Sequence, residues 1–377
     1  MKVLIVIQCT NLGGMEKSAY LMARELISLG VEVEYVSLNA IGALAPLLKE
    51  AGIRVSSAGY RGFAGWRSFL ATRRILRAIN ADAMIMVGHN LMAMLAAGRK
   101  WHERQILCMH FHHQGVKQDW IWRLIYKVAA GRFRAITFPS KFVFEEACRI
   151  APFVRMKGHV IANPFVLPKA RTDNDIQAAR IRLGMKPSDR IVGNAGWLIS
   201  RKRWDVFLDV AAGVARRAPQ VQFLIAGDGP DRGVLQRQAE RLGIAEQVRW
   251  LGWREDLTDF YLALDVMLFN SDFDALGRAP LEAMSHGVPL VASVVNCGLP
   301  EVVDSDEVGF LLRSHDIPTL RDRVIQLLRD DHAARALGHC GRMRVAEMGC
   351  PKRRARNILK VLGVEGSLVQ PADIGSE

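Results

Sequence analysis

The amino-acid sequence predicts an α/β protein made of two Rossmann-like, doubly wound parallel-sheet domains that face a central cleft. Short apolar runs alternate with amphipathic stretches of helical length, which is the pattern of buried parallel strands and the helices that cover them. A polar stretch with two prolines, at 164–175, interrupts this alternation once. The chain of 377 residues is long enough for two cores.

The first domain is expected at 1–168. Its first apolar run, at 2–8, is predicted to be a strand, and a glycine turn leads from it into a helix that ends at Gly30. The second domain is expected at 169–350 and starts a new series of strands and helices. The strands of that series are predicted at 190–198, 221–230, 248–253, 266–271 and 288–293. Residues 351–377 are predicted to form a helix that crosses back to the first domain, followed by a loose tail.

The net charge of +13 is unevenly distributed. Residues 1–165 hold 22 Lys and Arg against 10 Asp and Glu, and most of this excess lies within 54–134. A basic first domain implies an acidic partner. A nucleic-acid partner is disfavoured because the chain has no recognisable nucleic-acid-binding module.

The cysteine pattern and the apolar segments favour a cytoplasmic protein. Six cysteines are scattered without a C-x-x-C pair, which argues against a disulfide framework or a zinc site. The apolar run at 2–8 is too short for a signal peptide. The most apolar long stretch, 83–98, contains His89 and Asn90 and is predicted to be a strand and a helix rather than a membrane span.

Residues suited to binding phosphate follow the predicted strands. Gly13 and Gly14 lie between a strand and a helix, where backbone N–H groups can face an anion. The run Arg201, Lys202 and Arg203 follows another strand and could clamp phosphate. Ligands in doubly wound sheets bind beyond the carboxyl ends of the strands, so these residues are expected near a ligand.

In the stretch at 271–293, the carboxylates Asp274 and Glu282 are separated by seven residues. Asp274 is expected in a loop, and Glu282 is expected about one turn inside a short helix that begins just after Gly277. The helix dipole alone explains an acid at Glu282 but neither the glycine loop nor the second acid.

Seven segments, taken in order, give a specific pattern. Those of the first half are "GGMEKSA", "ILCMH" and "VIANP", and those of the second half are "GWLISRKRWD", "FLIAGDGP", "DALGRAPLEAMSHGVPLVAS" and "CGLPEVV". In these segments the chain resembles the retaining nucleotide-sugar glycosyltransferases of glycosyltransferase family 4, which have the GT-B fold. The resemblance covers most of the chain and is strongest over 190–312.

The resemblance implies a role for each matching residue. Glu282 would bind the ribose hydroxyls of the nucleotide, and Asp274 would bind hydroxyls of the donor sugar. Lys202 would neutralise the departing diphosphate, and His110 would lie near the reacting sugar; His110, Lys202 and Asp274 are therefore the expected catalytic residues. The remaining residues expected at the donor site are Gly14, Trp197, Arg201, Gly227, Trp253, Leu276 and Gly277.

Two positions depart from the family pattern. Trp197 stands where the family usually has an arginine, and Asp274 stands where it commonly has a glutamate. Arg201 or Arg203 could supply the missing guanidinium. The departures leave two alternatives open, an altered donor site and a weakened one.

Some motifs have a second interpretation. "DFD" at 272–274 resembles a metal-binding D-x-D motif, but its second aspartate already has a role, and no metal is expected. His110, His112 and His113 are too close together, without an acid or cysteine partner, to favour zinc. The basic, aromatic segments 60–80 and 117–134 are either amphipathic helices packed on the sheet or a surface that contacts anionic lipid.

The sequence thus predicts a cytoplasmic, metal-independent transferase without a cofactor, with peripheral contact to the inner face of the membrane. A nucleotide sugar, UDP-linked rather than GDP-linked, is the expected donor, and a glycan or lipid-linked molecule is the expected acceptor. Cell-surface polysaccharide or glycolipid assembly is the expected setting. The alternatives are a GT-B-fold nucleotide-sugar epimerase and a non-catalytic regulatory protein with a decayed donor site.

Overall fold

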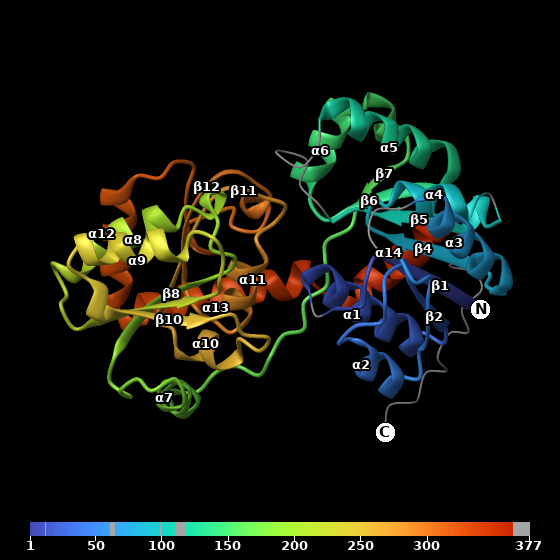
Figure 1. Ribbon diagram of the computed structural model, residues 1–377. Helices are drawn as coiled ribbons and strands as arrows, with labels where there is room; N and C mark the ends of the chain where they lie inside the picture. The colour runs from blue at the N-terminus through green and yellow to red at the C-terminus, as the bar shows by residue number, and fades with distance from the viewer. Residues whose placement is uncertain (12, 61–64, 99, 111–117, 365–377) are drawn as a thin grey trace, which may run out of the picture. The chain divides into compact units, whose positions relative to one another are not determined.

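The computed structural model describes residues 1–11, 13–60, 65–98, 100–110 and 118–364. These residues form two compact units, one built from Met1–Pro164 with the segment that starts at Gly349, the other from Phe165–Met348. Each unit contains one parallel sheet with helices packed against it (Figure 1).

The sheet of the first unit has the strand order β3-β2-β1-β4-β5-β6-β7, and each pair of neighbours is parallel. The order reverses between β1 and β4, which is where doubly wound sheets bind ligands. The strands are β1 (Lys2–Ile7), β2 (Glu32–Ser37), β3 (Arg54–Ser57), β4 (Ala83–Val87), β5 (Gln105–Cys108), β6 (Ala135–Phe138) and β7 (Gly158–Val160).

The helices of the first unit include one from the end of the chain, α14 (Pro351–Leu362), which lies beside α1 in Figure 1. Ile358 and Leu359 of α14 are buried in the same core as Val3 of β1. The buried Arg354 fixes α14 further, because its guanidinium donates hydrogen bonds to the carbonyl oxygens of Ile161 and Ala162. The other helices are α1 (Gly14–Ser28), α2 (Ala45–Glu50), α3 (Trp66–Ala78), α4 (Leu91–Ala97), α5 (Asp119–Arg132) and α6 (Lys141–Ile150).

The sheet of the second unit has the order β10-β9-β8-β11-β12-β13, again with parallel neighbours. Its strands are β8 (Arg190–Ala195), β9 (Val221–Ala226), β10 (Val248–Gly252), β11 (Val266–Asp274), β12 (Leu290–Cys297) and β13 (Phe310–Leu312). Its helices are α7 (Asp173–Arg182), α8 (Trp204–Ala215), α9 (Arg232–Arg241), α10 (Thr258–Ala263), α11 (Arg278–Ser285), α12 (Ile317–Arg329) and α13 (Asp331–Met348).

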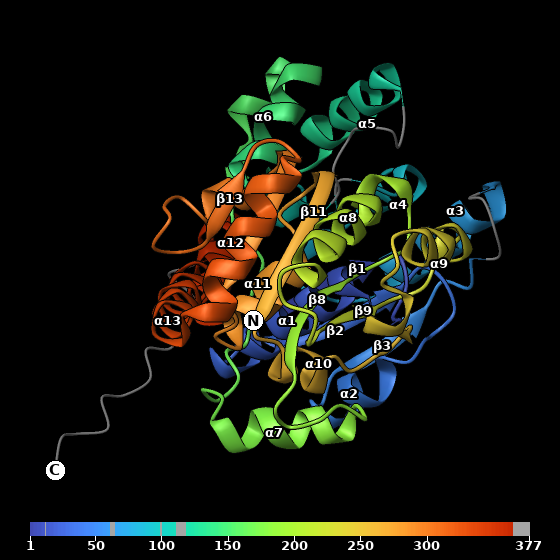
Figure 2. The same cartoon turned by 90° about the vertical axis from the view of Figure 1, so that its left-hand side faces the viewer.

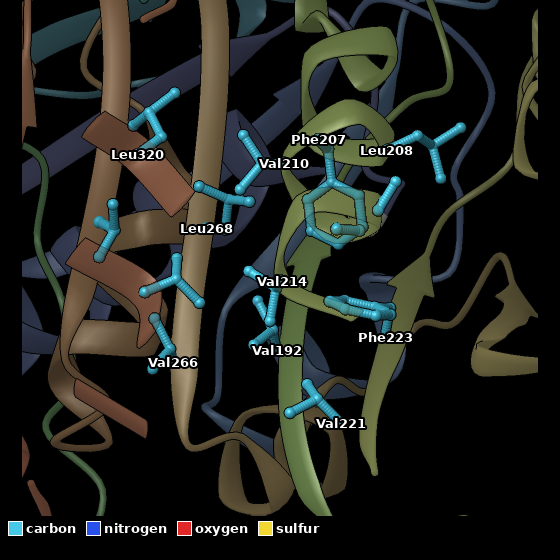
Figure 3. Close-up of a cluster of buried hydrophobic side chains, with 14 of the residues drawn as sticks. Val192, Phe207, Leu208, Val210, Val214, Val221, Phe223, Val266, Leu268 and Leu320 are labelled. Atoms are coloured by element: carbon cyan, nitrogen blue, oxygen red, sulfur yellow. The ribbon is translucent and has the colours of Figure 1, made fainter. Parts of the chain in front are cut away.

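Successive residues of each central strand of this sheet pack into different cores. Val192 and Leu268 contribute to the core under α8, α9 and α12, and Figure 3 shows them near Phe207 of α8. Their chain neighbours Ile191 and Met267 contribute to the core under α10 and α11. Burial on both faces explains why these strands are continuous apolar runs. In Figure 2, α8 and α12 lie along β11.

The expectation that Asp274 lies in a loop is wrong, because Asp274 is the last residue of β11. Parallel pairing with β12 continues to the pair Asp274 and Cys297 and holds the backbone extended. Among the helices that the structure describes, none is both long and apolar enough to cross a bilayer.

Candidate functional site

The candidate site lies at the carboxyl ends of β8, β9, β10 and β11 in the second unit. Three glycines bring the first three strand ends together: the Gly196 N–H donates to the Ala226 carbonyl at 2.9 Å, and the Gly227 N–H donates to the Gly252 carbonyl at 2.8 Å. Gly227 has a φ of +149°, and a Cβ placed on it would lie 1.9 Å from the Gly196 oxygen. Only glycine therefore permits this close approach of the two turns.

Lys202 and Asp274 form an ion pair at the end of β11. Lys202 lies in a short 3-10 helix, Ser200–Lys202, after β8, and its ammonium contacts Asp274 Oδ2. The other oxygen, Oδ1, accepts a hydrogen bond of 2.9 Å from the Ala275 N–H. Burial alone would raise the pKa of Asp274, but the adjacent Lys202 charge holds it below its usual value. The site thus offers an ionised carboxylate and a neighbouring cation.

Gly277 precedes α11 and turns the chain from β11 into this helix. Its φ of +78° lies in the left-handed region, which favours glycine. Pro280 falls in the first turn of the helix, where its missing N–H removes no intrahelical bond. Leu276 is 7% exposed, so its side chain anchors the turn in the core. The first N–H groups of a helix have no acceptor within the helix, and they suit an anionic group.

Glu282 of α11 is held by two partners that the sequence did not indicate as site residues. Glu282 Oε1 accepts a hydrogen bond of 2.7 Å from Arg278 Nε, and Oε2 accepts one of 2.9 Å from the Tyr261 hydroxyl. Burial and the Glu282 charge raise the pKa of Tyr261 well above its usual value, so the hydroxyl stays a donor. The Glu282 side chain remains 25% exposed, and each oxygen retains a lone pair for a ligand hydroxyl.

Trp197 and Trp253 are brought together by the turns after β8 and β10. Each is 58% exposed, and the ring centres lie 5.9 Å apart at an interplanar angle of 81°. The Trp204 indole N–H donates to the Trp197 carbonyl at 2.9 Å and fixes the first turn. An exposed pair of aromatic rings at a strand-end loop is suited to stacking against a planar or sugar ring.

The two arginines near Lys202 differ in what they can do for a phosphate. Arg203 donates to Asp205 at 2.9 Å and to Asp272 at 3.1 Å, and the hydrogen bonds to Asp205 and Asp272 raise its pKa. Arg201 lies over the ring of Phe273, 5.3 Å from its centre. Arg203 is therefore occupied by two carboxylates. Arg201 is the better candidate to supply the guanidinium of the family's arginine, which Trp197 replaces.

A row of hydrogen-bonded polar side chains supports the end of β11, and the sequence analysis did not predict it. Asp272 Oδ1 lies 3.0 Å from His315 Nε2, and His315 Nδ1 lies 2.6 Å from Ser293 Oγ. Asn270 donates to Ser293 Oγ at 2.7 Å. Ser293 and Asn270 are both 0% exposed, so Ser293 is no accessible nucleophile, and the chain serves to position Asp272. The close pairing of Asp272 with Arg203 and His315 also argues against the D-x-D interpretation.

The two remaining predicted residues lie in the first unit, at the carboxyl edge of its sheet. Gly14 is the first residue of α1, which follows β1, and His110 follows β5 by two residues. His112 and His113 lie outside the described residues. Across the part of the chain that the structure describes, no cluster of His, Cys, Asp and Glu side chains could hold a metal ion.

Two family models match the chain, one in each unit. "Glycosyltransferase Family 4" matches residues 12–167, and "Glycosyl transferases group 1" matches residues 175–344. Both halves of the chain thus match glycosyltransferase family models, and the two Rossmann-like units have the GT-B fold.

Part of the chain aligns with each of two relatives. It is 28% identical over 185 residues to the N-acetyl-alpha-D-glucosaminyl L-malate synthase of Bacillus anthracis, a match that covers 48% of each chain. It is 26% identical over 220 residues to the lipopolysaccharide core biosynthesis mannosyltransferase LpsB of Rhizobium meliloti, which covers 56% of this chain and 62% of LpsB. These matches span about half to two thirds of the relatives' length.

The fold resembles solved glycosyltransferase structures over nearly the whole chain. Anabaena Alr3699/HepE, solved in complex with UDP and glucose, superposes with a TM-score of 0.81 at 21% identity, covering 96% of this chain and 99% of HepE. WaaG, a glycosyltransferase involved in lipopolysaccharide biosynthesis, superposes with a TM-score of 0.71 at 14% identity, covering 95% of this chain and 99% of WaaG. At such identities the similarity shows a common fold.

Proposed function

We propose that the protein is a retaining glycosyltransferase that moves a sugar from a nucleotide sugar to a glycan or a lipid-linked acceptor. The observation that carries the proposal is the Lys202–Asp274 pair at the end of β11, followed by the left-handed Gly277 and by Glu282 on α11. The two family models and the GT-B fold support the same reaction class.

In this proposal the second unit binds the donor. Glu282, fixed by Tyr261 and Arg278, accepts hydrogen bonds from the ribose hydroxyls, and Asp274 accepts them from the donor sugar. As the bond to the diphosphate breaks, Lys202, Arg201 and the first N–H groups of α11 stabilise the negative charge without a metal ion. A UDP-linked donor is favoured, since the complexes of HepE contain UDP, UDP with glucose, or UDP-glucose.

The first unit is proposed to bind the acceptor, and its residues Gly14 and His110 lie at the carboxyl edge of its sheet. Its helix α5 carries a hollow lined by Trp120, Arg123, Leu124 and Lys127. Trp120 is 64% exposed, so an accessible apolar ring lies beside the positive charges of Arg123 and Lys127. Surfaces that contact anionic lipid have the same combination. This surface supports attachment to the inner face of the membrane. We propose a cytoplasmic protein that takes a lipid-linked acceptor, in polysaccharide or glycolipid assembly.

The membrane contact is tested by sedimentation with phosphatidylglycerol vesicles at low salt. We expect the wild type to sediment and the double variant Trp120→Ser/Lys127→Gln to remain in the supernatant. If the wild type also remains in the supernatant, the membrane part of the proposal fails.

The reaction is tested by proton NMR of UDP-glucose and UDP-N-acetylglucosamine incubated with the protein and membrane lipid extract. The proposal expects release of UDP that requires acceptor, and a product anomeric signal of the same configuration as the donor. Conversion of the donor to an epimer without acceptor would show an epimerase instead. Binding without any turnover would show a decayed site, which the replacement of the family's arginine by Trp197 makes a specific alternative; Trp197→Arg would then restore turnover.

A further inference from the structure

A cavity separate from the candidate donor site lies in the second unit, at the opposite edge of the sheet. Its volume is about 630 Å³, within the range of small-molecule pockets. Arg190 at the start of β8, Asp265 just before β11 and Pro289 just before β12 line it, so the cavity lies at the amino ends of these strands. All of its lining residues belong to the second unit.

The cavity carries an excess of positive charge. Five arginines line it against three aspartates. Asp265 is already paired with two of the arginines, Arg180 at 2.8 Å and Arg190 at 3.1 Å. Arg190 also pairs with Asp331 at 2.8 Å, and the exposed Arg335 lies 3.5 Å from Asp173. Among the described residues, Arg171 and Arg342 are the lining arginines that have no carboxylate partner.

Arg171 and Arg342 are held by backbone carbonyl groups. Arg171 donates to the Leu264 carbonyl at 2.6 Å and to the Gly287 carbonyl at 3.1 Å, and Arg342 donates to the carbonyls of Ser285 and Pro168. These bonds fix the guanidinium groups without neutralising them, because a carbonyl has no net charge. Burial lowers the pKa of Arg171 to about 10, which still leaves it charged at neutral pH.

The cavity is physically connected to the donor site through α11. His286, directly after α11, lines the cavity, and its ring stacks on that of Tyr261 with 5.3 Å between ring centres. Tyr261 in turn donates to the Glu282 carboxylate at 2.9 Å. His286 Nδ1 also lies 2.9 Å from the Glu282 backbone oxygen. A ligand that orders His286 therefore acts on the residue proposed to bind ribose.

We propose that this cavity binds the phosphate group of a small soluble molecule, such as a sugar phosphate, and that its occupancy strengthens nucleotide binding at Glu282. Arginine is the side chain best suited to hold a phosphate, and the volume leaves room for an organic part beyond it. The ligand fixes the end of α11 and so orders His286 and Tyr261 before the nucleotide arrives. The coupling, though not the cavity itself, rests on the proposed donor site.

The test is calorimetric titration of glucose 6-phosphate into the full chain saturated with UDP, which blocks the donor site. Arg335→Gln/His339→Gln removes two exposed cavity side chains, so the fold is retained. We expect one binding site in the wild type and an affinity at least about ten-fold weaker in this variant, since each factor of ten is 1.4 kcal/mol. Arg237→Gln, an exposed arginine on α9, is the matched control and should bind like the wild type.

The coupling is read from the dissociation constant of UDP with and without glucose 6-phosphate. We expect glucose 6-phosphate to tighten UDP binding about five-fold in the wild type, a typical coupling, and not in Arg335→Gln/His339→Gln. If glucose 6-phosphate does not bind the wild type, or binds the variant with the same affinity, the cavity assignment is overturned. Equal UDP affinity in both conditions overturns the coupling.

UDP binding distinguishes a failure of the proposed function from a failure of the cavity proposal. If UDP does not bind at all, the proposed function fails, and glucose 6-phosphate titrated alone still tests the cavity through the same variant. Phosphatidylglycerol vesicles should not displace glucose 6-phosphate; displacement would assign the cavity to a lipid headgroup and contradict a soluble ligand.

Discussion

The two carboxylates of the candidate donor site are held in different ways. Asp274 is balanced by the charge of Lys202, whereas Glu282 is oriented by one neutral and one charged donor, Tyr261 and Arg278. We expect the first pair to affect stability as well as function, and the second set to affect mainly ligand affinity.

Replacement of Lys202 by methionine should destabilise the protein in a pH-dependent way. The pKa of Asp274 is lowered in the folded state, so this group stabilises the fold above the usual aspartate pKa of about 4, and the effect is lost as pH falls through the folded-state value. We expect Lys202→Met to lower the free energy of unfolding by about 1–3 kcal/mol at pH 7. Urea denaturation at pH 7 and at acidic pH measures this difference.

The double variant Lys202→Met/Asp274→Asn is the control for that prediction. It removes both charges, so it should recover part of the lost stability at pH 7. A loss for Lys202→Met that is equally large at acidic pH would contradict the role of the Asp274 charge.

Tyr261→Phe should weaken UDP binding while leaving Glu282 in place. The variant removes one hydrogen bond to the carboxylate, which is typically equivalent to about 1 kcal/mol, or roughly five-fold in affinity. Tyr60→Phe, which alters a buried hydroxyl contact with Thr72 in the first unit, should leave the affinity unchanged. Equal affinities for wild type and Tyr261→Phe, measured by calorimetry, would show that Glu282 needs no such support.

Some of these contacts were accessible from sequence and others were not. Arg278 lies four residues before Glu282 on a predicted helix, so spacing alone could have indicated the pair. Tyr261 is 21 residues away on another helix, and only the packing of α10 against α11 brings it to the carboxylate. Trp197 and Trp253 follow β8 and β10, which lie on either side of β9, so their contact depends on the strand order of the sheet.

At the scale of secondary-structure elements, the site depends on where strands end. The strand–helix alternation was readable from apolar runs, but the end of β11 was misplaced. Its last residues, Phe273 and Asp274, stay extended because they pair with Asn296 and Cys297 of β12. Such pairing is a property of the sheet, and the local sequence around Asp274 contains no signal for it.

The turn after β9 should tolerate no side chain at Gly227. Alanine there would place a Cβ 1.9 Å from the Gly196 oxygen at a φ of +149°, and we expect a loss of about 2–4 kcal/mol in unfolding free energy. Gly233 on α9 has no such contact, so Gly233→Ala should be neutral or stabilising by up to about 1 kcal/mol. Similar thermal stability of the two variants would contradict the close approach of the turns.

At the scale of the whole molecule, the chain forms two units with separate cores, and its last described helix belongs to the first. The alternation of strands and helices allowed the two parallel sheets to be predicted. The sequence analysis predicted a terminal helix that returns to the first domain but gave no contact for it. In the structure, Ile358, Leu359 and Arg354 of α14 are buried.

Leu359→Ala should therefore destabilise the first unit although it lies near the end of the chain. The side chain is 0% exposed, and truncation of a buried leucine typically lowers stability by about 2–5 kcal/mol. Hydrogen exchange should accelerate in β1 and β2 and stay unchanged in β8 and β9. Faster exchange in both sheets would show that the two units unfold as one.

The central claim is that the carboxyl edge of the second sheet is a nucleotide-sugar site, and calorimetric titration of UDP and GDP tests it most directly. We expect UDP to bind the wild type and to bind Glu282→Gln at least about ten-fold more weakly, since hydrogen bonds to a charged group contribute about 1.5–3 kcal/mol. UDP binding that is identical in the two proteins, or absent from the wild type, would contradict the account.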